Sequence, residues 1–185
     1  SLRKLLADCL ALVAQRATDK GLSLSHEIGA LPDTLVGDAT RLSQALVNLL
    51  GNAIKFTDQG GVHVSVQPLE QAPDALLLRF AVRDSGIGIA ADASERLFKA
   101  FVQADASTTR QYGGTGLGLV ITQNLARLMG GDVGFSSTPG QGSEFWFSAR
   151  LTRQAEAPQA VDEQADAEDP AEGLRRLPAG ARVLL

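Results

Sequence analysis

The segment "DATRLSQALVNLLGNAIKF", from Asp38 to Phe56, has a helical pattern around which the rest of the fold can be placed. Aspartate is a common helix N-cap, so we predict a helix that begins at Asp38 and runs to about Phe56. Residues at steps of three and four fall on one face of a helix. The apolar face of this helix comprises Leu42, Leu46, Leu49, Leu50 and Ala53. We expect this face to pack into the core.

The opposite face of the same predicted helix is polar. It comprises Arg41, Gln44, Asn48, Asn52 and Lys55. Two asparagines one turn apart are unusual on a merely solvated face, because asparagine is a mediocre helix former. An amide oxygen is a hard ligand that suits Mg²⁺, and a lysine one turn further along can reach phosphate oxygens. From this pattern alone, the polar face is either a solvated surface or a site that binds magnesium and phosphate.

The flanking segments alternate between the helical period and the two-residue period of a strand. We predict helices over residues 2–20, 93–100 and 117–129; the first ends at Gly21, and Asp92 with Glu95 forms a capping box for the second. We predict strands over residues 22–28, 61–67, 75–84, 132–137 and 143–152. Helices and strands mixed without strict alternation indicate an α/β sandwich, with one mixed sheet and helices on one of its faces.

A second motif, "RDSGIGI", runs from Arg83 to Ile89 at the end of the predicted strand 75–84. That strand delivers Asp84 into a turn in which Gly86 and Gly88 let a ligand approach the backbone closely. A buried carboxylate accepts a hydrogen bond from an exocyclic amine such as that of adenine, and repels the carbonyl that guanine has there. The alternative is a tight Asp/Gly turn with no ligand.

A third motif, "YGGTGLGL", runs from Tyr112 to Leu119 and enters the predicted helix 117–129. Backbone N–H groups at a glycine-rich helix start form an anion site. The motif lacks the Gly-Lys-Ser/Thr of a P-loop, and no strand precedes it as a dinucleotide-binding fingerprint requires. Taken alone it is weak evidence for phosphate binding.

In this order, the three motifs resemble the N, G1 and G2 boxes of the ATP-binding catalytic domain of histidine kinases, the GHKL or Bergerat fold. The matching segments are "NLLGNAIKFT" (Asn48 to Thr57), "DSGIGI" (Asp84 to Ile89) and "GGTGLGL" (Gly113 to Leu119), with "RLFKAF" (Arg96 to Phe101) as the F box. The resemblance covers about residues 1–152. It implies an α+β fold: a two-layer α/β sandwich with a mixed, mostly antiparallel sheet and helices on one face.

The resemblance also implies roles for individual residues, with ATP and Mg²⁺ as cofactors. Asn52 would ligate Mg²⁺, Asn48 would assist it, and Lys55 would contact phosphate. Asp84 would bind the adenine amine, and Arg110, in a lid over residues 102–116, would contact the γ-phosphate. The other nucleotide-binding positions it implies are Gly86, Gly88, Ile89, Phe98, Gly114, Thr115, Gly116, Leu117 and Gly118.

The residue at position 48 separates two reaction classes. In the related gyrase-type and HSP90-type ATPases the matching position holds a glutamate that activates water, whereas the amide of Asn48 cannot act as a general base near pH 7. The resemblance therefore implies transfer of the γ-phosphoryl group to a protein histidine. The alternatives are a GHKL-type ATPase and a nucleotide-binding pseudokinase that acts as a switch.

The segment "SHEIGALP", Ser25 to Pro32, resembles the H box in which such kinases carry their phosphoacceptor histidine. Gly21, Gly29 and Pro32 leave too short a window for the exposed helix that an acceptor needs. We predict instead that His26 is a partly buried strand residue that points to the same side as Leu22 and Leu24. The acceptor is then expected on a helical hairpin upstream of Ser1.

Charge and composition divide the chain unevenly. Seven of its 21 acidic residues lie between Gln154 and Gly173, where there is no lysine or arginine. The remaining 14 match the 14 basic residues from Arg3 to Arg153, so the body has no basic field for nucleic acid. We predict a catalytic domain over residues 1–152 and a disordered acidic linker over 153–178.

The expected partners follow from the resemblance. The final segment "GARVLL" resembles the first strand of a receiver domain, so residues 179–185 are interpreted as the start of a truncated receiver domain in a hybrid kinase. The implied partners are the upstream dimerisation hairpin, a receiver domain or response regulator, and a second copy in a full-length homodimer.

No apolar run in the sequence approaches the ~18 residues of a membrane helix. We expect a cytoplasmic domain without membrane contact, in a full-length protein anchored in the inner membrane.

Overall fold

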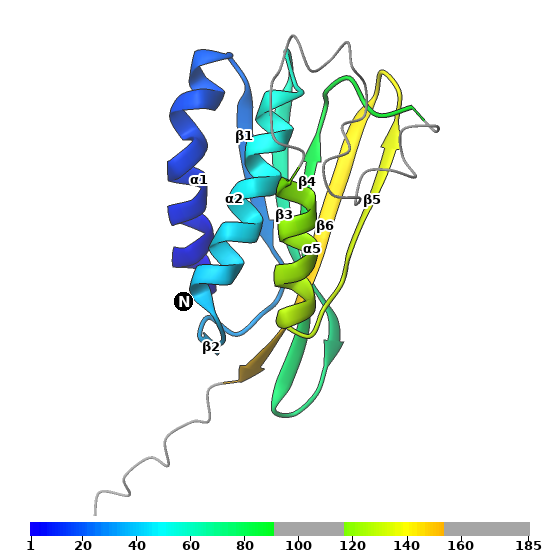
Figure 1. Cartoon of the computed structure of the whole chain (residues 1–185). Helices are drawn as coiled ribbons and strands as arrows, with labels where there is room; N and C mark the ends of the chain where they lie inside the picture. Colours follow the sequence, from blue (N-terminus) through cyan, green and yellow to red (C-terminus); the bar gives the residue numbers. More distant parts are fainter. Residues whose placement is uncertain (91–116, 154–185) are drawn as a thin grey trace, which may run out of the picture. The chain divides into compact units, whose positions relative to one another are not determined.

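The computed structural model describes residues 1–90 and 117–153 (Figure 1). The chain separates into two compact units, Ser1–Gln154 and Ala155–Leu185, and the second lies outside the described residues. The helices of the first unit in the described ranges are α1 (Leu2–Asp19), α2 (Ala39–Lys55) and α5 (Gly118–Leu128). The strands there are β1 (Ser23–Ile28), β2 (Leu35–Val36), β3 (Gly61–Gln71), β4 (Ala75–Asp84), β5 (Val133–Thr138) and β6 (Gly142–Arg153).

The strands of the described ranges form one six-stranded sheet in the order β1-β3-β4-β6-β2, and β5 pairs with β6 as well. Only the pairing of β1 with β3 is parallel; the other pairings in this part of the chain are antiparallel. The three helices lie side by side over the same face of the sheet, with α2 between α1 and α5 (Figure 1). The predicted two-layer α/β sandwich with a mixed, mostly antiparallel sheet is confirmed.

Local capping chemistry fixes the ends of α1 and α2. The N–H of Lys4 donates to Ser1 Oγ at 3.2 Å, and Gly21, with φ at 66°, takes the left-handed conformation that ends α1. At the start of α2, the N–H of Arg41 donates to Asp38 Oδ1 at 2.9 Å. The predicted bounds of both helices are therefore confirmed to within one residue.

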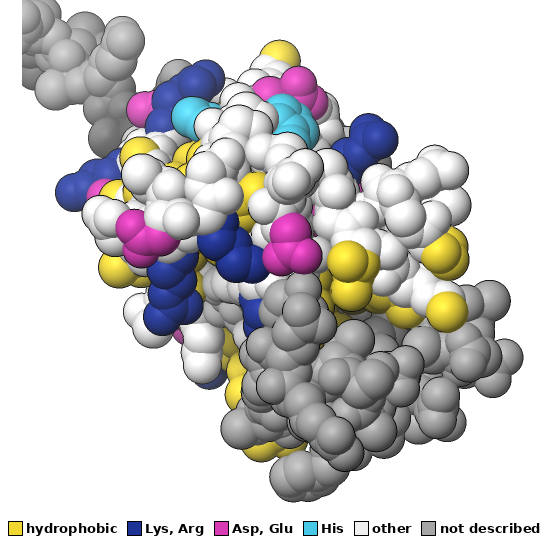
Figure 2. Space-filling view, turned by 90° about the horizontal axis from the view of Figure 1, so that it is seen from above, with side chains coloured by type: hydrophobic (Ala, Val, Ile, Leu, Met, Phe, Trp, Pro, Cys, Tyr) yellow, Lys and Arg dark blue, Asp and Glu magenta, His cyan; other side chains and the backbone are white. Residues whose placement is uncertain are grey.

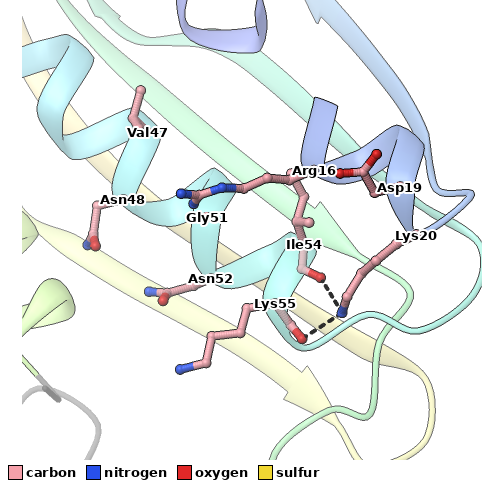
Figure 3. Close-up of a pocket in the computed structure, with 9 residues that line it drawn as sticks. All are labelled: Arg16, Asp19, Lys20, Val47, Asn48, Gly51, Asn52, Ile54 and Lys55. Carbon is pink, nitrogen blue, oxygen red and sulfur yellow. Dashed lines mark hydrogen bonds between the residues drawn. The ribbon is translucent and has the colours of Figure 1, made fainter. Parts of the chain in front are cut away.

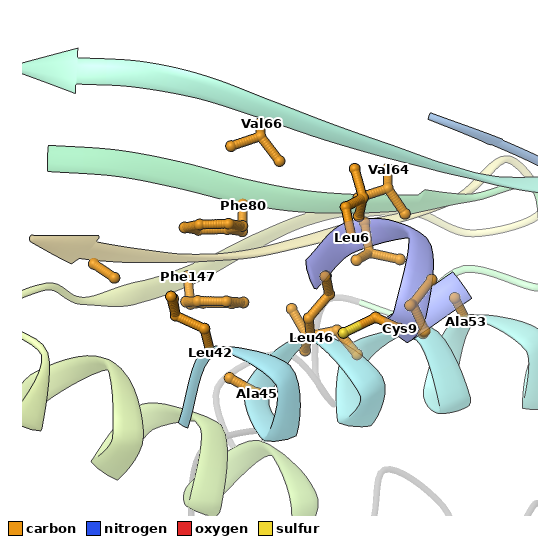
Figure 4. Packing of buried hydrophobic residues seen from close by; sticks show 14 of the residues in the cluster. Leu6, Cys9, Leu42, Ala45, Leu46, Ala53, Val64, Val66, Phe80 and Phe147 are labelled. Atoms are coloured by element: carbon orange, nitrogen blue, oxygen red, sulfur yellow. The ribbon is translucent and has the colours of Figure 1, made fainter. Parts of the chain in front are cut away.

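The core lies between the sheet and the helices α1 and α2 (Figure 4). All five residues of the predicted apolar face of α2 are buried. Opposite them, Phe80 of β4 and Phe147 of β6 stack with ring centroids 4.9 Å apart. A buried leucine contributes about 1.5–3 kcal/mol, so Leu46 and Leu50, both fully buried, anchor α2 firmly enough to position its opposite face.

Two strands differ from prediction. β3 continues four residues beyond the predicted end at residue 67, through an irregularity in its pairing with β4 between Pro68 and Glu70. Proline has no N–H for the ladder, so the strand passes this position with a register shift rather than regular pairing. β2 was not predicted, because two residues, Leu35 and Val36, are too short to show a period.

His26 lies in β1, as predicted, but it is exposed rather than partly buried. It pairs with Val64 of β3 and so shares the helix-facing side with Leu24. Because β1 is the edge strand, this side of it is only partly covered: Leu24 and Ile28 are half-buried against the core, whereas His26 between them is exposed. Figure 2 shows the histidine side chains, in cyan, at the surface of the unit.

None of the helices in the described ranges combines the length and the apolar character needed to cross a membrane.

Candidate functional site

The polar face of α2 borders a hollow of about 620 Å³ beside the end of α1 (Figure 3). Asn48, Asn52 and Lys55 project from one side of α2, as the helical spacing predicts. The side-chain amide of Asn52 makes no hydrogen bond to any other described residue. The hollow is lined by Arg16, Asp19, Lys20, Val47, Asn48, Gly51, Asn52, Ile54 and Lys55.

The amide of Asn48 joins α2 to the first turn of α5. Asn48 Nδ2 donates to Thr122 Oγ1 at 2.8 Å, and Thr122 Oγ1 donates to the carbonyl of Gly118 at 3.1 Å. Gly118 itself lies directly against the Asn48 amide, and a Cβ at this position would collide with Asn48 Oδ1. Glycine at position 118 therefore leaves the space that the Asn48 amide occupies, and a larger residue would displace this amide.

Asp84 ends β4 inside the unit, with an exposed fraction of 7%. Its Oδ1 accepts hydrogen bonds from the N–H of Gly86 at 2.9 Å and of Ser143 at 3.2 Å. Desolvation raises the pKa of this carboxyl above its usual 3.8, and the two backbone hydrogen bonds oppose that rise. Oδ2 has no partner among the described residues. Because no fully buried side-chain polar atom there lacks a partner, Oδ2 must reach open space.

The turn after Asp84 is held between the end of α2 and the β5–β6 hairpin. A Cβ on Gly86 would collide with the carbonyl oxygen of Phe56, which also accepts a hydrogen bond from the N–H of Ile87 at 3.3 Å. Gly88 has φ at 68° and lies against the carbonyl of Thr138. Both glycines are thus required by close backbone contacts.

Two serines of the β5–β6 hairpin, Ser137 and Ser143, form hydrogen bonds with the glycine turn and with Asp84. Ile89 donates its N–H to Ser137 Oγ at 2.8 Å, and Ser137 Oγ lies 2.9 Å from Ser143 Oγ. Ser143 in turn donates its backbone N–H to Asp84. The two serines therefore connect the far end of the glycine turn to the buried carboxylate.

Two lysines lie at the C-terminal end of α2: Lys55, which ends this helix, and Lys20, which reaches it from the end of α1. Lys55 Nζ lies 4.7 Å from the centroid of the Phe56 ring, and desolvation lowers the pKa of this amine below its usual 10.5. Lys20, from the end of α1, donates to the carbonyls of Ile54, Lys55 and Thr57, each at 3.0 Å. Lys20 thereby satisfies carbonyls that the end of an α-helix leaves without partners.

The described residues bring the second motif and the last residues of the third, from Leu117 on, together along α2. α5 begins beside Asn48, and the glycine turn packs on Phe56, eight residues or about 12 Å further along the helix. Leu117 and Gly118 precede and begin α5. The remaining predicted site residues, Phe98, Arg110, Gly114, Thr115 and Gly116, lie outside the described residues.

Sequence reasoning missed four residues that support the site: Lys20, Thr122, Ser137 and Ser143. No local signal marks Lys20 or Thr122, because their partners lie 34–37 and 74 residues away in the chain. Ser143 lies in "GSEFWF", which fits the pattern of the family, but that resemblance did not indicate its contact with Asp84.

An open α/β sandwich with an asparagine-bearing helix, a buried aspartate and a glycine-rich helix start defines a nucleotide-binding domain. Residues 37–153 match the family described as histidine kinase-, DNA gyrase B-, and HSP90-like ATPase. This match spans more than half of the chain, which therefore belongs to that ATP-binding family.

Relatives narrow the class further. The chain is 47% identical over 151 residues to the signal transduction histidine-protein kinase BarA of Escherichia coli K12, which covers 81% of this chain and 16% of BarA. It is 47% identical over 154 residues to the sensor histidine kinase GacS of Pseudomonas protegens, covering 83% of this chain and 17% of GacS. The chain thus spans less than a fifth of these relatives, and it is an ATP-binding catalytic domain of the histidine kinase type.

Solved structures agree with this class. The crystal structure of full-length ShkA in complex with AMPPNP matches with a TM-score of 0.72 and 40% identity, covering 84% of this chain and 31% of that one. The catalytic domain of histidine kinase ThkA matches with a TM-score of 0.64 and 24% identity over 80% of this chain and 91% of that one, which shows the shared fold.

Proposed function

We propose that this domain transfers the γ-phosphoryl group of ATP to a histidine on a helical hairpin upstream of Ser1 in the full-length protein. The observation that carries the proposal is the amide at position 48. Its N–H₂ donates to Thr122, and an amide has no basic lone pair near neutral pH. A glutamate at this position would favour attack by water, whereas Asn48 leaves the phosphoryl group for a protein nucleophile.

Each part of a magnesium–ATP complex has a residue suited to it in this site. Asp84 Oδ2, which has no partner among the described residues, would accept a hydrogen bond from the adenine amine. Asn52 fits Mg²⁺, because a hard cation takes oxygen ligands and this amide has no partner among the described residues. Lys55, one turn further on, would contact phosphate oxygens. When bound, Mg²⁺ would neutralise the charge of the phosphates that react.

The chain's own residues would act by positioning. The contacts of Phe56 with Gly86 and Ile87 hold the glycine turn, which follows Asp84, at the end of α2. The hydrogen bond of Asn48 to Thr122 holds the first turn of α5 beside Asn48. By resemblance, the backbone from Gly113 to Gly118 would surround the phosphates and Arg110 would contact the γ-phosphate. Phosphoryl transfer depends mainly on such alignment and on electrostatic stabilisation.

The proposed partners extend beyond this chain. The upstream hairpin would supply the acceptor histidine and hold two copies in a homodimer. A receiver domain would follow the acidic segment. An alignment over 185 residues with the sensory/regulatory protein RpfC of Xanthomonas campestris, 39% identical, covers 99% of this chain and supports continuity across that segment. The domain would act in the cytoplasm, with the full-length protein anchored in the inner membrane.

Incubation of the full-length protein with γ-labelled ATP and Mg²⁺ tests the proposal. We expect an acid-labile, base-stable label on the upstream histidine and none on His26 or His63. Replacing the upstream histidine with glutamine should abolish labelling while ATP affinity is unchanged. Steady ADP release without label would indicate an ATPase, and nucleotide binding without either reaction would indicate a switch; both results contradict the proposal.

A further inference from the structure

Thr122 lies at the contact between α2 and α5 and is almost completely buried, with an exposed fraction of 1%. Buried hydroxyl groups in helices commonly donate to the carbonyl four residues earlier, and Thr122 does so with Gly118 at 3.1 Å. A hydroxyl group has a single hydrogen. Because that hydrogen is directed to Gly118, Oγ1 can only accept from a second neighbour.

The second neighbour is the Asn48 amide, 2.8 Å away. Only the N–H₂ end of an amide can donate, so the orientation with Nδ2 on Thr122 keeps both hydrogen bonds. In the flipped orientation Oδ1 would repel the hydroxyl oxygen, unless the hydroxyl hydrogen turned to Oδ1 and gave up its bond to Gly118. Gly118 leaves the space that Oδ1 occupies, since a Cβ there would collide with it. Thr122 and Gly118 thus fix which end of the amide is held and which is left for a ligand.

We propose that Thr122 is the positioning residue for Asn48: it fixes the amide so that Oδ1, rather than N–H₂, is presented toward the magnesium–phosphate group. This inference rests on the proposed function of Asn48. An unheld amide would present its N–H₂ end to the cation for part of the time, and that end repels Mg²⁺. Thr122 would act through Asn48 and would not touch the nucleotide.

Two substitutions separate the hydroxyl group from the packing. Thr122→Val keeps the branched shape and removes the hydroxyl, and Thr122→Ser keeps the hydroxyl. Thr18→Val, on the exposed side of α1, is the matched control. We expect Thr122→Val to weaken binding of AMPPNP about three- to ten-fold when Mg²⁺ is present, the effect of one hydrogen bond, and less than two-fold when it is absent. Thr122→Ser should regain most of the loss, and Thr18→Val should match the parent.

A double-mutant cycle with Asn48→Ala tests whether Thr122 acts through Asn48. In the Asn48→Ala background, Thr122→Val should have no further effect on the Mg²⁺-dependent affinity. An equal effect in both backgrounds, or a loss that does not depend on Mg²⁺, would show a purely structural role and overturn the inference.

A readout without nucleotide keeps this inference separate from the proposed function. The side-chain N–H₂ protons of Asn48 in ¹⁵N-labelled protein should exchange slowly with solvent in the parent and in Thr122→Ser, and at least ten-fold faster in Thr122→Val. Equal exchange in all three proteins would contradict the positioning role. A different result is slow exchange of the Asn48 N–H₂ protons in a parent protein whose nucleotide affinity does not depend on Mg²⁺. That result would contradict the proposed function of the site, and with it the presentation of Oδ1 to magnesium.

Discussion

At the scale of single residues, the burial of Asp84 lowers stability at neutral pH, in conflict with its proposed role in binding adenine. Its carboxylate is held away from water by β6 and the glycine turn, and this desolvation raises its pKa above 3.8. An acid with a raised pKa binds its proton more tightly in the folded state. The free energy of unfolding therefore falls as pH rises from 3.8 through the raised pKa, and it stays lower above it.

We predict that Asp84→Asn raises the melting temperature at pH 7. Asparagine does not titrate, and its Oδ1 can still accept from Gly86 and Ser143. The difference in melting temperature from the parent should shrink as pH falls through the raised pKa and vanish below 3.8, which melting curves between pH 3 and 7 would show.

The same substitution, Asp84→Asn, should cost about 1.5–3 kcal/mol of ATP affinity, because the adenine amine would lose a charged acceptor. Unchanged affinity by calorimetry would place adenine elsewhere.

Asn52 gives the second prediction at this scale. Asn52→Ala should remove the gain in ATP affinity that Mg²⁺ produces, because the proposed ligand is lost. The fold should be unaffected or stabilised by up to about 0.7 kcal/mol, since alanine is the better helix former and Asn52 points away from Leu49 and Leu50. ATP titrations with and without Mg²⁺ measure the effect, with Gln44→Ala on the same face as control. An equal Mg²⁺ effect in variant and parent would rule Asn52 out as a ligand.

At the scale of elements, Lys20 connects the ends of two helices. Its amine donates to the carbonyls of Ile54, Lys55 and Thr57, and two of these three bonds are partly buried. Its ion pair with Asp58, 3.7 Å long and largely exposed, contributes little beside them. The end of α2 and the glycine turn that packs on it therefore depend on Lys20, the residue that follows α1.

Lys20→Met should lower the free energy of unfolding by about 1–2 kcal/mol, because methionine keeps the apolar stem and removes the charged donors. In a domain of this size the melting temperature should fall by about 2–4 °C per kcal/mol. Lys4→Met, an exposed lysine at the other end of α1, should have no effect. If Lys20→Met melts with the parent, the end of α2 is held by its packing alone.

The elements also show which features can be predicted from sequence. The bounds and the buried face of α2 follow from local signals, namely an aspartate cap and a three-to-four period. Asp84 at a strand end before two glycines was predicted for the same reason. The contacts of Lys20 and Thr122 depend on segments that only the tertiary fold brings together, and the exposure of His26 depends on β1 being an edge strand. Such features leave no local pattern.

At the scale of the whole molecule, the two histidines lie on opposite sides of the sheet's β1–β3 edge. His63 pairs with Ser25 and Arg83 on the side away from the helices, where its Nδ1 lies 2.9 Å from Ser25 Oγ. His26 lies on the helix-facing side at the open edge. Both are held in extended strands, unlike an acceptor presented on an exposed helix.

We therefore predict that His26→Gln in the full-length protein retains autophosphorylation. The exposed side chain has no hydrogen-bond partner among the described residues, so stability should change by less than about 0.5 kcal/mol. His63→Gln serves as a second variant that keeps a polar side chain. Loss of labelling in His26→Gln, with ATP affinity and melting temperature unchanged, would make His26 the acceptor and refute its assignment as a strand residue.

The only tryptophan of the chain, Trp146, lies on the face of the sheet opposite to the described helices α1, α2 and α5. Arg79 lies 5.1 Å from its ring centroid and bonds Glu144 at 2.7 Å, while Gly134 of β5 packs on its indole. The stacked Phe80 and Phe147 separate this face from the helices. Intrinsic fluorescence should therefore report unfolding of the sheet and remain unchanged on addition of nucleotide, which makes it an internal reference for every titration described above.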